Sequence, residues 1–268
     1  MNKKMKALVI LPTYNERETL PKVIVKVLDL KGFDILVVDD NSPDGTGSLA
    51  REWAERDSRV NLIERPGKLG LGTAYVAGFK WGLEQGYDCC IEMDSDLSHN
   101  PDDLKRFVEE IAEGSDLVIG SRYLRGTISV VGWDFHRLLL SKFGNFYASR
   151  ILNIPLTDLT AGFRAYSRKA LENINLEAIR SEGYSFQIEL TYLTWFAGLS
   201  VKEIPIIFTE RARGGSKMSG NIITEAVKLP WKLKSRELWQ RSKNFFLFKP
   251  SSTLAVRKRG SEHNHHVN

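Results

Sequence analysis

Residues 6–41, KALVILPTYNERETLPKVIVKVLDLKGFDILVVDDN, contain the pattern that decides the fold. The run Lys6–Leu11 is short and mostly apolar, as a buried strand is, and Ile35–Val38 is a second run of the same kind. Between them, Thr19–Leu30 carries apolar residues at helical spacing. A strand, a helix and a second strand in this order predict a crossover unit, in which the two strands lie parallel in one sheet.

The same alternation continues through the first half of the chain. Further strands are predicted at Val60–Ile63, Cys89–Met93 and Leu117–Ile119, and further helices at Gly45–Arg56, Thr73–Glu84 and Pro101–Glu113. Repeated crossover units predict an α/β fold with a mostly parallel central sheet that is flanked by helices on both faces.

The second half of the chain is less regular. It is predicted to contain a buried helix at Phe186–Phe196, a strand at Val201–Phe208 and a basic helix at Asn221–Lys243. The segment Trp133–Asn153 mixes aromatic, aliphatic and basic residues. We expect residues 1–243 to form a single domain with interfacial helices in its second half, and residues 244–268 to form a flexible basic tail.

Composition places the chain among globular proteins. Of its 268 residues, 42% are hydrophobic and 26% are charged. No apolar run approaches the roughly 18–20 residues that a membrane span requires, and Ala7–Pro12 is too short for a signal-peptide core. Cys89 and Cys90 are neighbours on a predicted strand, so their side chains point to opposite faces and are poorly placed to bond each other. We therefore expect a cytoplasmic protein with two buried thiols.

The charge is unevenly distributed along the chain. From Arg211 onward there are 13 Lys and Arg against 3 Asp and Glu, whereas residues 1–210 hold 25 against 30. A basic C-terminal part on an acidic body indicates a partner rich in phosphate: a nucleic acid, an anionic membrane or a phosphorylated substrate. For the end of the chain, a solvated basic tail is the preferred interpretation.

Polar clusters follow several of the predicted strands. They are Pro12-Thr13-Tyr14-Asn15-Glu16, Asp39-Asp40-Asn41, Asp94-Ser95-Asp96 and Gly120-Ser121-Arg122. In open α/β sheets, ligands bind outside the carboxyl ends of the strands. Although each cluster alone could be a turn or a helix cap, four at such strand ends predict one shared crevice.

Two of the polar segments are suited to binding a diphosphate. Asp94 and Asp96 can converge on a divalent cation, Mg²⁺ or Mn²⁺, that is bound mainly through substrate phosphates. The segment Arg211–Lys217 places two arginines and a lysine among small residues, and guanidinium groups favour a pyrophosphate.

Other nucleotide-binding and catalytic patterns do not fit the chain. Gly70-Leu71-Gly72 is followed by Tyr75 where a dinucleotide fingerprint requires Gly or Ala, which argues against hydride transfer with a nicotinamide. No Gly-Lys-Ser or Gly-Lys-Thr of a Walker loop occurs. No Ser-His-acid arrangement stands out, and His99 and His136 are assigned to surface or capping positions.

Several longer motifs together carry a family resemblance. They are residues 12–16 (PTYNE), 38–46 (VDDNSPDGT), 70–74 (GLGTA), 93–99 (MDSDLSH), 120–123 (GSRY), 160–165 (TAGFRA) and the basic segment 211–217. With these motifs, which span about residues 6–240, the chain resembles the polyprenol-phosphate (dolichyl-phosphate) mannosyltransferases, glycosyltransferases of family two with a GT-A nucleotide-diphospho-sugar transferase fold.

The resemblance implies a role for each matching position. The nucleoside of a GDP-sugar would be held by Pro12, Tyr14, Glu16, Val38 and Asp40, and the diphosphate with its divalent metal by Asp94, Ser95 and Asp96. Ser98 stands where related enzymes have Gln, and it is the candidate third metal ligand. The lipid phosphate would be engaged by Arg122, Arg137 and Ser141, and the donor would be covered by Arg211 and Lys217. Asp96, Arg122 and Arg137 are the expected catalytic residues.

The implied reaction is transfer of mannose from GDP-mannose to a polyprenyl monophosphate, with inversion at the anomeric carbon. The implied location is the inner face of a membrane, where a separate membrane-anchoring protein is a further conceivable partner. Three alternatives stay open at this stage. The same fold could use UDP-glucose or another donor, or another lipid or glycan acceptor; the chain could be a non-catalytic nucleotide-binding module; and a nucleic-acid binder is disfavoured by the acidic crevice.

Overall fold

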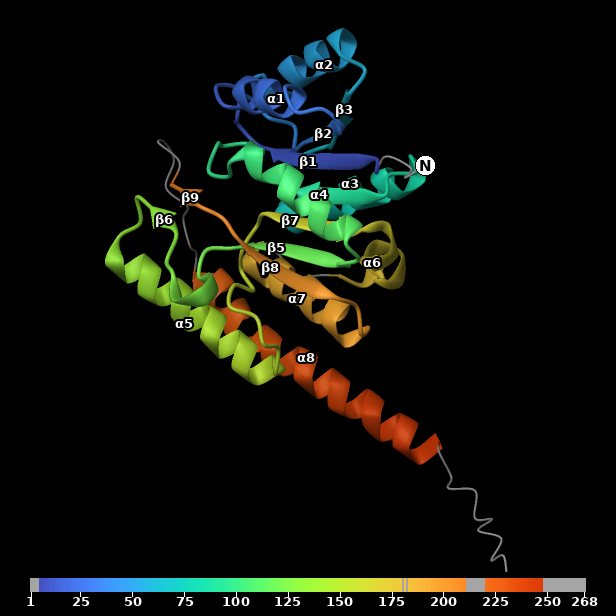
Figure 1. Ribbon diagram of the computed structural model, residues 1–268, viewed down its shortest axis with the longest axis vertical. Helices are drawn as coiled ribbons and strands as arrows, with labels where there is room; N and C mark the ends of the chain where they lie inside the picture. Colours follow the sequence, from blue (N-terminus) through green and yellow to red (C-terminus); the bar gives the residue numbers. More distant parts are fainter. Residues whose placement is uncertain (1–4, 180, 182, 211–219, 248–268) are drawn as a thin grey trace, which may run out of the picture. The chain divides into compact units, whose positions relative to one another are not determined.

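The computed structural model describes residues 5–179, 181, 183–210 and 220–247. By their internal contacts, Met1–Lys234 form one compact unit and Ser235–Asn268 a second. The first unit contains a seven-stranded sheet in the order β3-β2-β1-β4-β7-β5-β8 (Figure 1). Its strands are β1 (Ala7–Thr13), β2 (Phe33–Asp39), β3 (Val60–Glu64), β4 (Cys89–Glu92), β5 (Leu117–Ser121), β7 (Arg164–Ser167) and β8 (Val201–Pro205).

In the first half the helices alternate with these strands as predicted. The helices are α1 (Leu20–Leu28), α2 (Thr46–Arg56), α3 (Leu71–Glu84), α4 (Leu104–Ala112), α5 (Phe135–Leu152), α6 (Arg168–Asn173), α7 (Gly183–Phe196) and α8 (Gly220–Leu247). Helices α6 and α7 follow each other without a strand between them. Short 3₁₀ turns occur at Pro101–Asp103, Leu124–Gly126 and Leu176–Ala178. In the first half, the predicted strands and helices are present, and their ends differ from the prediction by at most three residues, the largest difference being the start of α4 at Leu104. The predicted α/β class with a mostly parallel sheet is confirmed.

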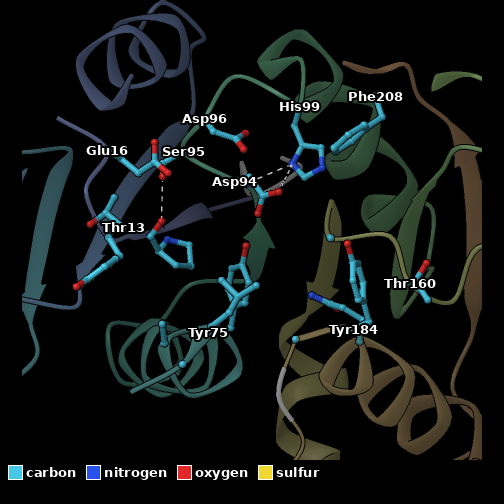
Figure 2. Close-up of a pocket in the computed structure, with 18 of the residues that line it drawn as sticks. Thr13, Glu16, Tyr75, Asp94, Ser95, Asp96, His99, Thr160, Tyr184 and Phe208 are labelled. Atoms are coloured by element: carbon cyan, nitrogen blue, oxygen red, sulfur yellow. Dashed lines mark hydrogen bonds and ion pairs between the residues drawn. The ribbon is translucent and has the colours of Figure 1, made fainter. Parts of the chain in front are cut away.

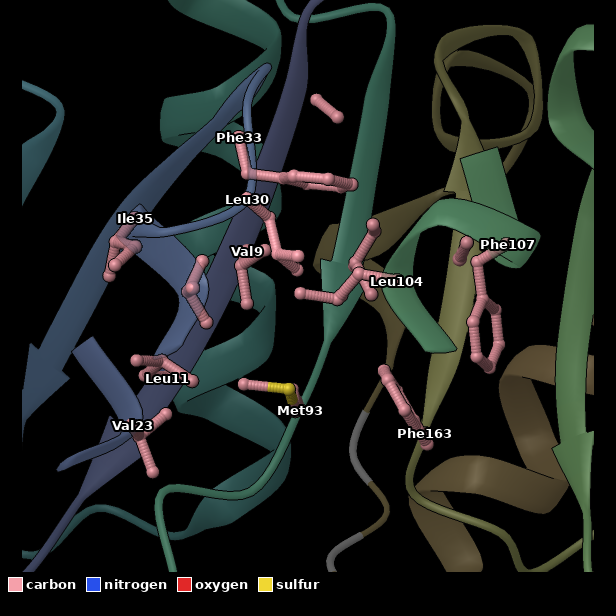
Figure 3. Close-up of a cluster of buried hydrophobic side chains, with 14 of the residues drawn as sticks. Val9, Leu11, Val23, Leu30, Phe33, Ile35, Met93, Leu104, Phe107 and Phe163 are labelled. Atoms are coloured by element: carbon pink, nitrogen blue, oxygen red, sulfur yellow. The ribbon is translucent and has the colours of Figure 1, made fainter. Parts of the chain in front are cut away.

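Alternation along the strands divides the core into two layers. Val9 and Leu11 of β1 face α1, α2 and α4, and they belong to the apolar cluster in Figure 3. Leu8 and Ile10 face α3, α6 and α7. Because successive strand residues point to opposite faces, a continuous apolar run buries both faces of the sheet. Cys89 and Cys90 follow the same rule: they lie buried in the two different layers as free thiols, as predicted.

The sequence analysis missed strand β7. It pairs antiparallel with β4 on one side and with β5 on the other, while the other pairs in the sheet are parallel. Its four residues include the buried Arg164, whose guanidinium donates to the carbonyls of Leu159, Ala161 and Gln187. Tertiary hydrogen bonds, which the local pattern does not reveal, allow this charged residue to occupy a central strand.

The predicted strand Val201–Phe208 is divided in the structure. Its first part forms the edge strand β8, and Phe208–Thr209 form β9, which pairs with β6 (Val130–Val131) in a separate two-stranded sheet. Pro205 ends β8, since it has no N–H to donate. The single predicted strand is therefore corrected to two short ones, and this break places β9 beside the functional edge of the main sheet.

A third apolar cluster joins α5, α7 and α8 within the first unit. Ala148 and Leu152 of α5 pack with Ile188 of α7 and with Leu229 and Leu233 of α8. The predicted helices Phe186–Phe196 and Asn221–Lys243 are thus present as α7 and α8. Within the described ranges, no helix is long and apolar enough to cross a membrane.

Candidate active site

The four predicted strand-end clusters line one cleft of about 400 Å³ (Figure 2). Residues after β1, β2, β4 and β5 meet there because the carboxyl ends of these parallel strands share one edge of the sheet. The loops bend sharply at this edge: Asn15, Asn41 and Leu97 have positive φ values of 64°, 56° and 65°. A left-handed backbone is unfavourable for leucine, and such conformations gather at functional sites. The shared crevice predicted from sequence is confirmed.

One end of the cleft is formed by the loops after β1 and β2. Pro12, Tyr14, Glu16 and Asp40, four of the predicted donor-binding residues, line it together with Lys68. The Lys68 ammonium lies 4.2 Å from the centre of the Tyr14 ring. This end therefore offers an aromatic face, a cation and carboxylates, which suit a nucleoside.

Asp40 is buried beside Arg65, whose Nε lies 2.9 Å from the aspartate Oδ1. Burial raises the pKa of Asp40, and the charge of Arg65 opposes this shift. The remaining predicted donor contact, Val38, lies in the apolar layer between the sheet and α3 and is not among the cleft-lining residues.

The loop after β4 presents two carboxylates to the middle of the cleft, Asp94 and Asp96. The Asp96 Oδ1 accepts a hydrogen bond from the Ser98 N–H at 2.9 Å, and the Ser95 hydroxyl donates to the Pro12 carbonyl at 3.0 Å. The first bond holds the turn of the loop itself, and the second ties the loop to β1. Both carboxylates are therefore held at the cleft by backbone geometry that the sequence Asp-Ser-Asp-Leu-Ser creates.

His99 supports this loop, a role that its assignment to a surface or capping position did not foresee. It is buried, its ring stacks on Phe163 at 4.8 Å, and its Nδ1 accepts the Asp94 N–H at 3.2 Å. Burial lowers the pKa of His99 to about 4, so the ring is neutral at pH 7 and Nδ1 can accept. The only signal in the sequence is that His99 lies three residues after Asp96. Its contact with the Asp94 backbone depends on the folded loop.

The donor set at this loop fits a divalent cation that is bound together with a substrate. Two aspartates face the cleft, and the part of the chain that the structure describes contains no cluster of three or more His, Cys, Asp or Glu suited to a metal. Mg²⁺ and Mn²⁺ commonly take one or two carboxylates and obtain the other oxygens from phosphates and water. Ser98, the predicted third ligand, is buried and outside the cleft lining, so its assignment stays a prediction.

At the other end of the cleft, Arg122 forms a buried ion pair with Asp158. The arginine Nε and Nη2 each donate to a different carboxylate oxygen of Asp158 at 2.7 Å, and Nη2 also donates to Thr160. Burial opposes ionisation of both groups, but their mutual attraction and hydrogen bonds outweigh it, lowering the pKa of Asp158 and raising that of Arg122. Asp158 was not singled out from the sequence, and Thr160 was noted there only as the first residue of the motif 160–165.

Arg137 and Ser141, the other predicted acceptor residues, lie one turn apart on α5. Arg137 is ion-paired with Glu210, and its guanidinium lies 4.3 Å from the Trp133 ring centre. Ser141 accepts a hydrogen bond from the Tyr123 hydroxyl at 2.8 Å. Arg211 and Lys217 lie outside the described residues.

A second, apolar cavity of about 360 Å³ adjoins this end of the cleft. We call it the apolar groove; it is lined by Leu140, Ser141, Phe143, Gly144, Tyr147, Ile188, Ala226 and Val227, and it shares Trp133, Arg137, Thr160 and Tyr184 with the cleft. The groove lies among α5, α7 and α8. The site therefore combines a polar cleft with an apolar extension, and Arg137 stands at their junction.

A mostly parallel sheet with paired aspartates in a cleft at its carboxyl edge is the arrangement expected of a glycosyltransferase with the GT-A nucleotide-diphospho-sugar transferase fold. The comparisons with known proteins agree. The sequence pattern of glycosyl transferase family 2 matches residues 8–174, and the chain belongs to this family.

Two relatives match most of the chain. It is 51% identical over 224 residues to the polyprenol monophosphomannose synthase of Mycolicibacterium smegmatis, covering 83% of this chain and 84% of that protein. It is 48% identical to the undecaprenyl-phosphate mannosyltransferase of Micrococcus luteus, covering 83% and 91%.

Solved structures with the same fold include glucosyl-3-phosphoglycerate synthase from Mycobacterium tuberculosis in complex with Mn²⁺, UDP-glucose and phosphoglyceric acid. The TM-score is 0.60 at 21% identity, covering 84% of this chain and 80% of that one. At this identity the likeness establishes the fold.

Proposed function

We propose that the protein transfers mannose from GDP-mannose to a polyprenyl monophosphate, giving polyprenyl-phosphate-mannose and GDP with inversion at the anomeric carbon. The observation that carries the proposal is the junction at Arg137, where a polar cleft with two aspartates opens into an apolar groove. A lipid phosphate needs both environments side by side. The names of the two relatives supply mannose and the polyprenyl acceptor.

The chemistry is a displacement at the anomeric carbon. An oxygen of the acceptor phosphate forms a bond to C1 of mannose, the bond from C1 to the β-phosphate oxygen breaks, and GDP leaves with the electron pair. The acceptor would enter from the groove and GDP would leave toward the loops after β1 and β2. Attack and departure on opposite sides of C1 invert its configuration.

The acceptor needs no protein base. A phosphate monoester has a second pKa near about 6, so it is mostly a dianion at neutral pH. His99 agrees with this expectation, because its Nδ1 is occupied by the Asp94 N–H and its ring is buried. Arg137 and Ser141 would orient the phosphate, and Arg122 would contribute positive charge from its fixed position on Asp158.

Charge that develops on the departing diphosphate needs stabilisation. Asp94 and Asp96 would hold a divalent cation there, which supplies electrostatic stabilisation of the leaving group when it is bound. In the proposed roles, Arg211 and Lys217 add positive charge over the same diphosphate.

We further propose that the protein works at the cytoplasmic face of a membrane. On α5, Phe135, Phe143 and Phe146 are 67%, 65% and 65% exposed, an unusual cost in water for three aromatic side chains of one helix. Lys142 and Arg150 lie on the same helix. Exposed aromatic residues with basic neighbours favour the interface of an anionic membrane, where the polyprenyl acceptor resides.

The test is an assay of purified protein with labelled GDP-mannose, a polyprenyl phosphate and Mg²⁺, counting label in the organic phase. Mild-acid release of that label and its loss in Asp96→Ala are the expected results. Asp102→Ala is the matched control, since Asp102 is exposed and outside the cleft lining. UDP-glucose is assayed in parallel, and lipid labelling from UDP-glucose alone would overturn the mannosyl assignment while keeping the glycosyl transfer.

A further inference from the structure

Tyr75, on helix α3, has a hydroxyl with no hydrogen-bond partner among the described residues. The side chain is 0% exposed, yet Tyr75 is one of the residues that line the cleft. Figure 2 shows the phenol directed up toward the carboxylate of Asp94 from below. A buried polar group without a partner is unfavourable and calls for an explanation, and a ligand in the cleft is one such explanation.

The position of this hydroxyl is fixed by packing. The Tyr75 ring is stacked between Phe79 and Phe186, with centroid distances of 6.3 Å and 6.2 Å. The side chain cannot turn away to find another partner without disrupting this stack. The fold therefore holds the hydroxyl at the floor of the cleft, where a ligand group can meet it.

A second polar group lies in the same floor. Gln187 of α7 is 3% exposed and lines the cleft; its Nε2 donates to the Glu92 Oε2 at 2.7 Å, and its Oε1 has no partner within the described ranges. The bond to Glu92 fixes the amide as the aromatic stack fixes the phenol. The floor thus holds a hydroxyl that can donate and accept and an amide oxygen that accepts.

The order of groups along the cleft indicates which ligand part meets this floor. In Figure 2, Thr13 and Glu16 lie on one side of Asp94, Tyr184 and Thr160 lie on the other, and Tyr75 is in the middle. A nucleotide sugar bound with its nucleoside at the first side and its acceptor at the second has its sugar between them. Sugar hydroxyls both donate and accept, which complements Tyr75 and Gln187.

We propose that Tyr75 is a specificity-determining residue that reads a hydroxyl group of the transferred hexose, with Gln187 beside it. The inference rests on the proposed function only in taking the ligand to be a nucleotide sugar, and it adds the residue that recognises the sugar. A site that hydrogen-bonds a substrate hydroxyl discriminates against analogues that lack it, because its own buried group is then left unpaired.

The variant that tests this is Tyr75→Phe, which removes the hydroxyl and keeps the aromatic stack. We expect kcat/KM for the nucleotide sugar that the wild type transfers to fall about tenfold. The dissociation constant of GDP, measured with Mn²⁺, should stay unchanged, because GDP lacks the hexose that Tyr75 is proposed to contact. Tyr166→Phe is the matched control, since Tyr166 is equally buried but does not line the cleft.

A series of donors, each lacking one hexose hydroxyl, gives the decisive comparison. On the wild type, the analogue without the hydroxyl read by Tyr75 should lose about tenfold, whereas on Tyr75→Phe it should lose nothing further. Additive losses for every analogue would overturn the proposal. An equal loss of GDP affinity in Tyr75→Phe would also overturn it, and would instead make Tyr75 a support for the Asp94 loop.

Failure of the Tyr75 inference can be told apart from failure of the mannosyl assignment. If the wild type transfers glucose and not mannose, the mannosyl assignment fails, and the same variant is tested with deoxy forms of the glucose donor. Calorimetric binding of the nucleotide sugar and of the free nucleotide makes the same comparison without turnover. A Tyr75→Phe variant that binds both as the wild type does would contradict the inference.

Discussion

Arg122 and Arg137 both line the acceptor end of the cleft, but their charges are compensated differently. Arg122 is buried, and its guanidinium is bound through two hydrogen bonds to the fully buried Asp158. Arg137 pairs with Glu210, and the two side chains keep 24% and 30% of their surface exposed. A buried ion pair is costly to break, and a partly exposed one is not. We therefore expect Arg122 to stay bound to Asp158, whereas Arg137 can exchange Glu210 for a substrate phosphate; we call the two arginines the fixed and the exchangeable charge.

The buried pair should make stability depend on Asp158. Asp158→Asn leaves the Arg122 charge without its partner, and we expect it to lower the free energy of unfolding at pH 7 by about 3–5 kcal/mol. The pKa of Asp158 is lowered by folding, so this contribution is complete well above the ordinary value of 3.8 and is lost as pH falls below it. Denaturant unfolding between pH 7 and pH 3 should therefore show a steeper acid loss in the wild type than in the variant. Asp102→Asn, at an exposed position, should behave as the wild type.

Removing the carboxylate of the exchangeable pair should favour substrate binding, whereas removing that of the buried pair should weaken the fold. An acceptor phosphate that binds Arg137 has to compete with the Glu210 carboxylate, so Glu210→Gln should lower the KM for polyprenyl phosphate by about two- to fivefold. Initial rates at varied acceptor concentration measure this change. Glu177→Gln removes an exposed ion pair with Lys80 away from the cleft and should leave the KM unchanged. A higher KM in Glu210→Gln would mean that Glu210 holds Arg137 in place for the phosphate.

At the scale of the elements, helix α3 approaches the sheet closely because it carries glycines on its inner face. A Cβ at Gly78 would lie 2.6 Å from the Ile10 Cγ2, and one at Gly82 would lie 2.6 Å from the Cys90 Sγ. This close packing brings Tyr75, on the same helix, under the carboxylates after β4. The spacing of small residues on α3 thus determines the depth of the cleft floor.

Gly78→Ala should destabilise the protein by about 1–3 kcal/mol, because the added methyl group overlaps a strand residue that cannot move away. Gly144→Ala on α5 is the matched substitution at an open position, where nothing lies within 4 Å of the added Cβ. There the higher helix propensity of alanine should stabilise by up to about 1 kcal/mol. Urea denaturation of both variants measures these changes, and equal effects of the two would refute the packing argument.

Helix α5 is the element proposed to contact the membrane. Replacing both Phe143 and Phe146 with serine removes two aromatic side chains that are each 65% exposed, so the fold should be retained. We expect sedimentation with anionic vesicles to fall several-fold, because interfacial binding scales with buried apolar area. Val25→Ser changes an exposed apolar residue on α1 and should leave vesicle binding as it is. Undiminished binding of the double variant would place the membrane contact elsewhere.

At the scale of the whole molecule, folding and ligand binding are linked through the two aspartates at the cleft. They supply only part of a coordination shell, so a divalent cation should bind well only together with a diphosphate. Mn²⁺ and GDP added together should raise the melting temperature by several degrees, and more than the sum of their separate effects. Thermal unfolding with each ligand, with both and with EDTA tests this. If Mn²⁺ alone raised the melting temperature as much as Mn²⁺ and GDP together, the cation would not need the diphosphate for binding. Asp96→Ala should abolish the additional increase that the two ligands give together.

The sequence by itself determined the repeated strand–helix pattern and the polar groups at the strand ends, because both follow from local periodicity. The runs in residues 6–41 specify parallel strands, and parallel strands place Tyr14, Asp40 and Asp94 at one edge without further information. The cytoplasmic setting, the sugar donor and the roles of Arg211 and Lys217 were predicted from composition or resemblance, and they stay predictions.

Only the tertiary structure decided the features that depend on contacts between distant segments. Examples are the insertion of β7 between β4 and β5, the pairing of Arg122 with Asp158, the burial of His99 under Asp94 and the hydroxyl of Tyr75 at the cleft floor. The apolar groove is of the same kind, because α5, α7 and α8 contribute to it from widely separated parts of the chain. A local pattern records which face of an element is apolar, but not which partner covers that face, and partner choice is settled by packing and hydrogen bonding in the folded chain.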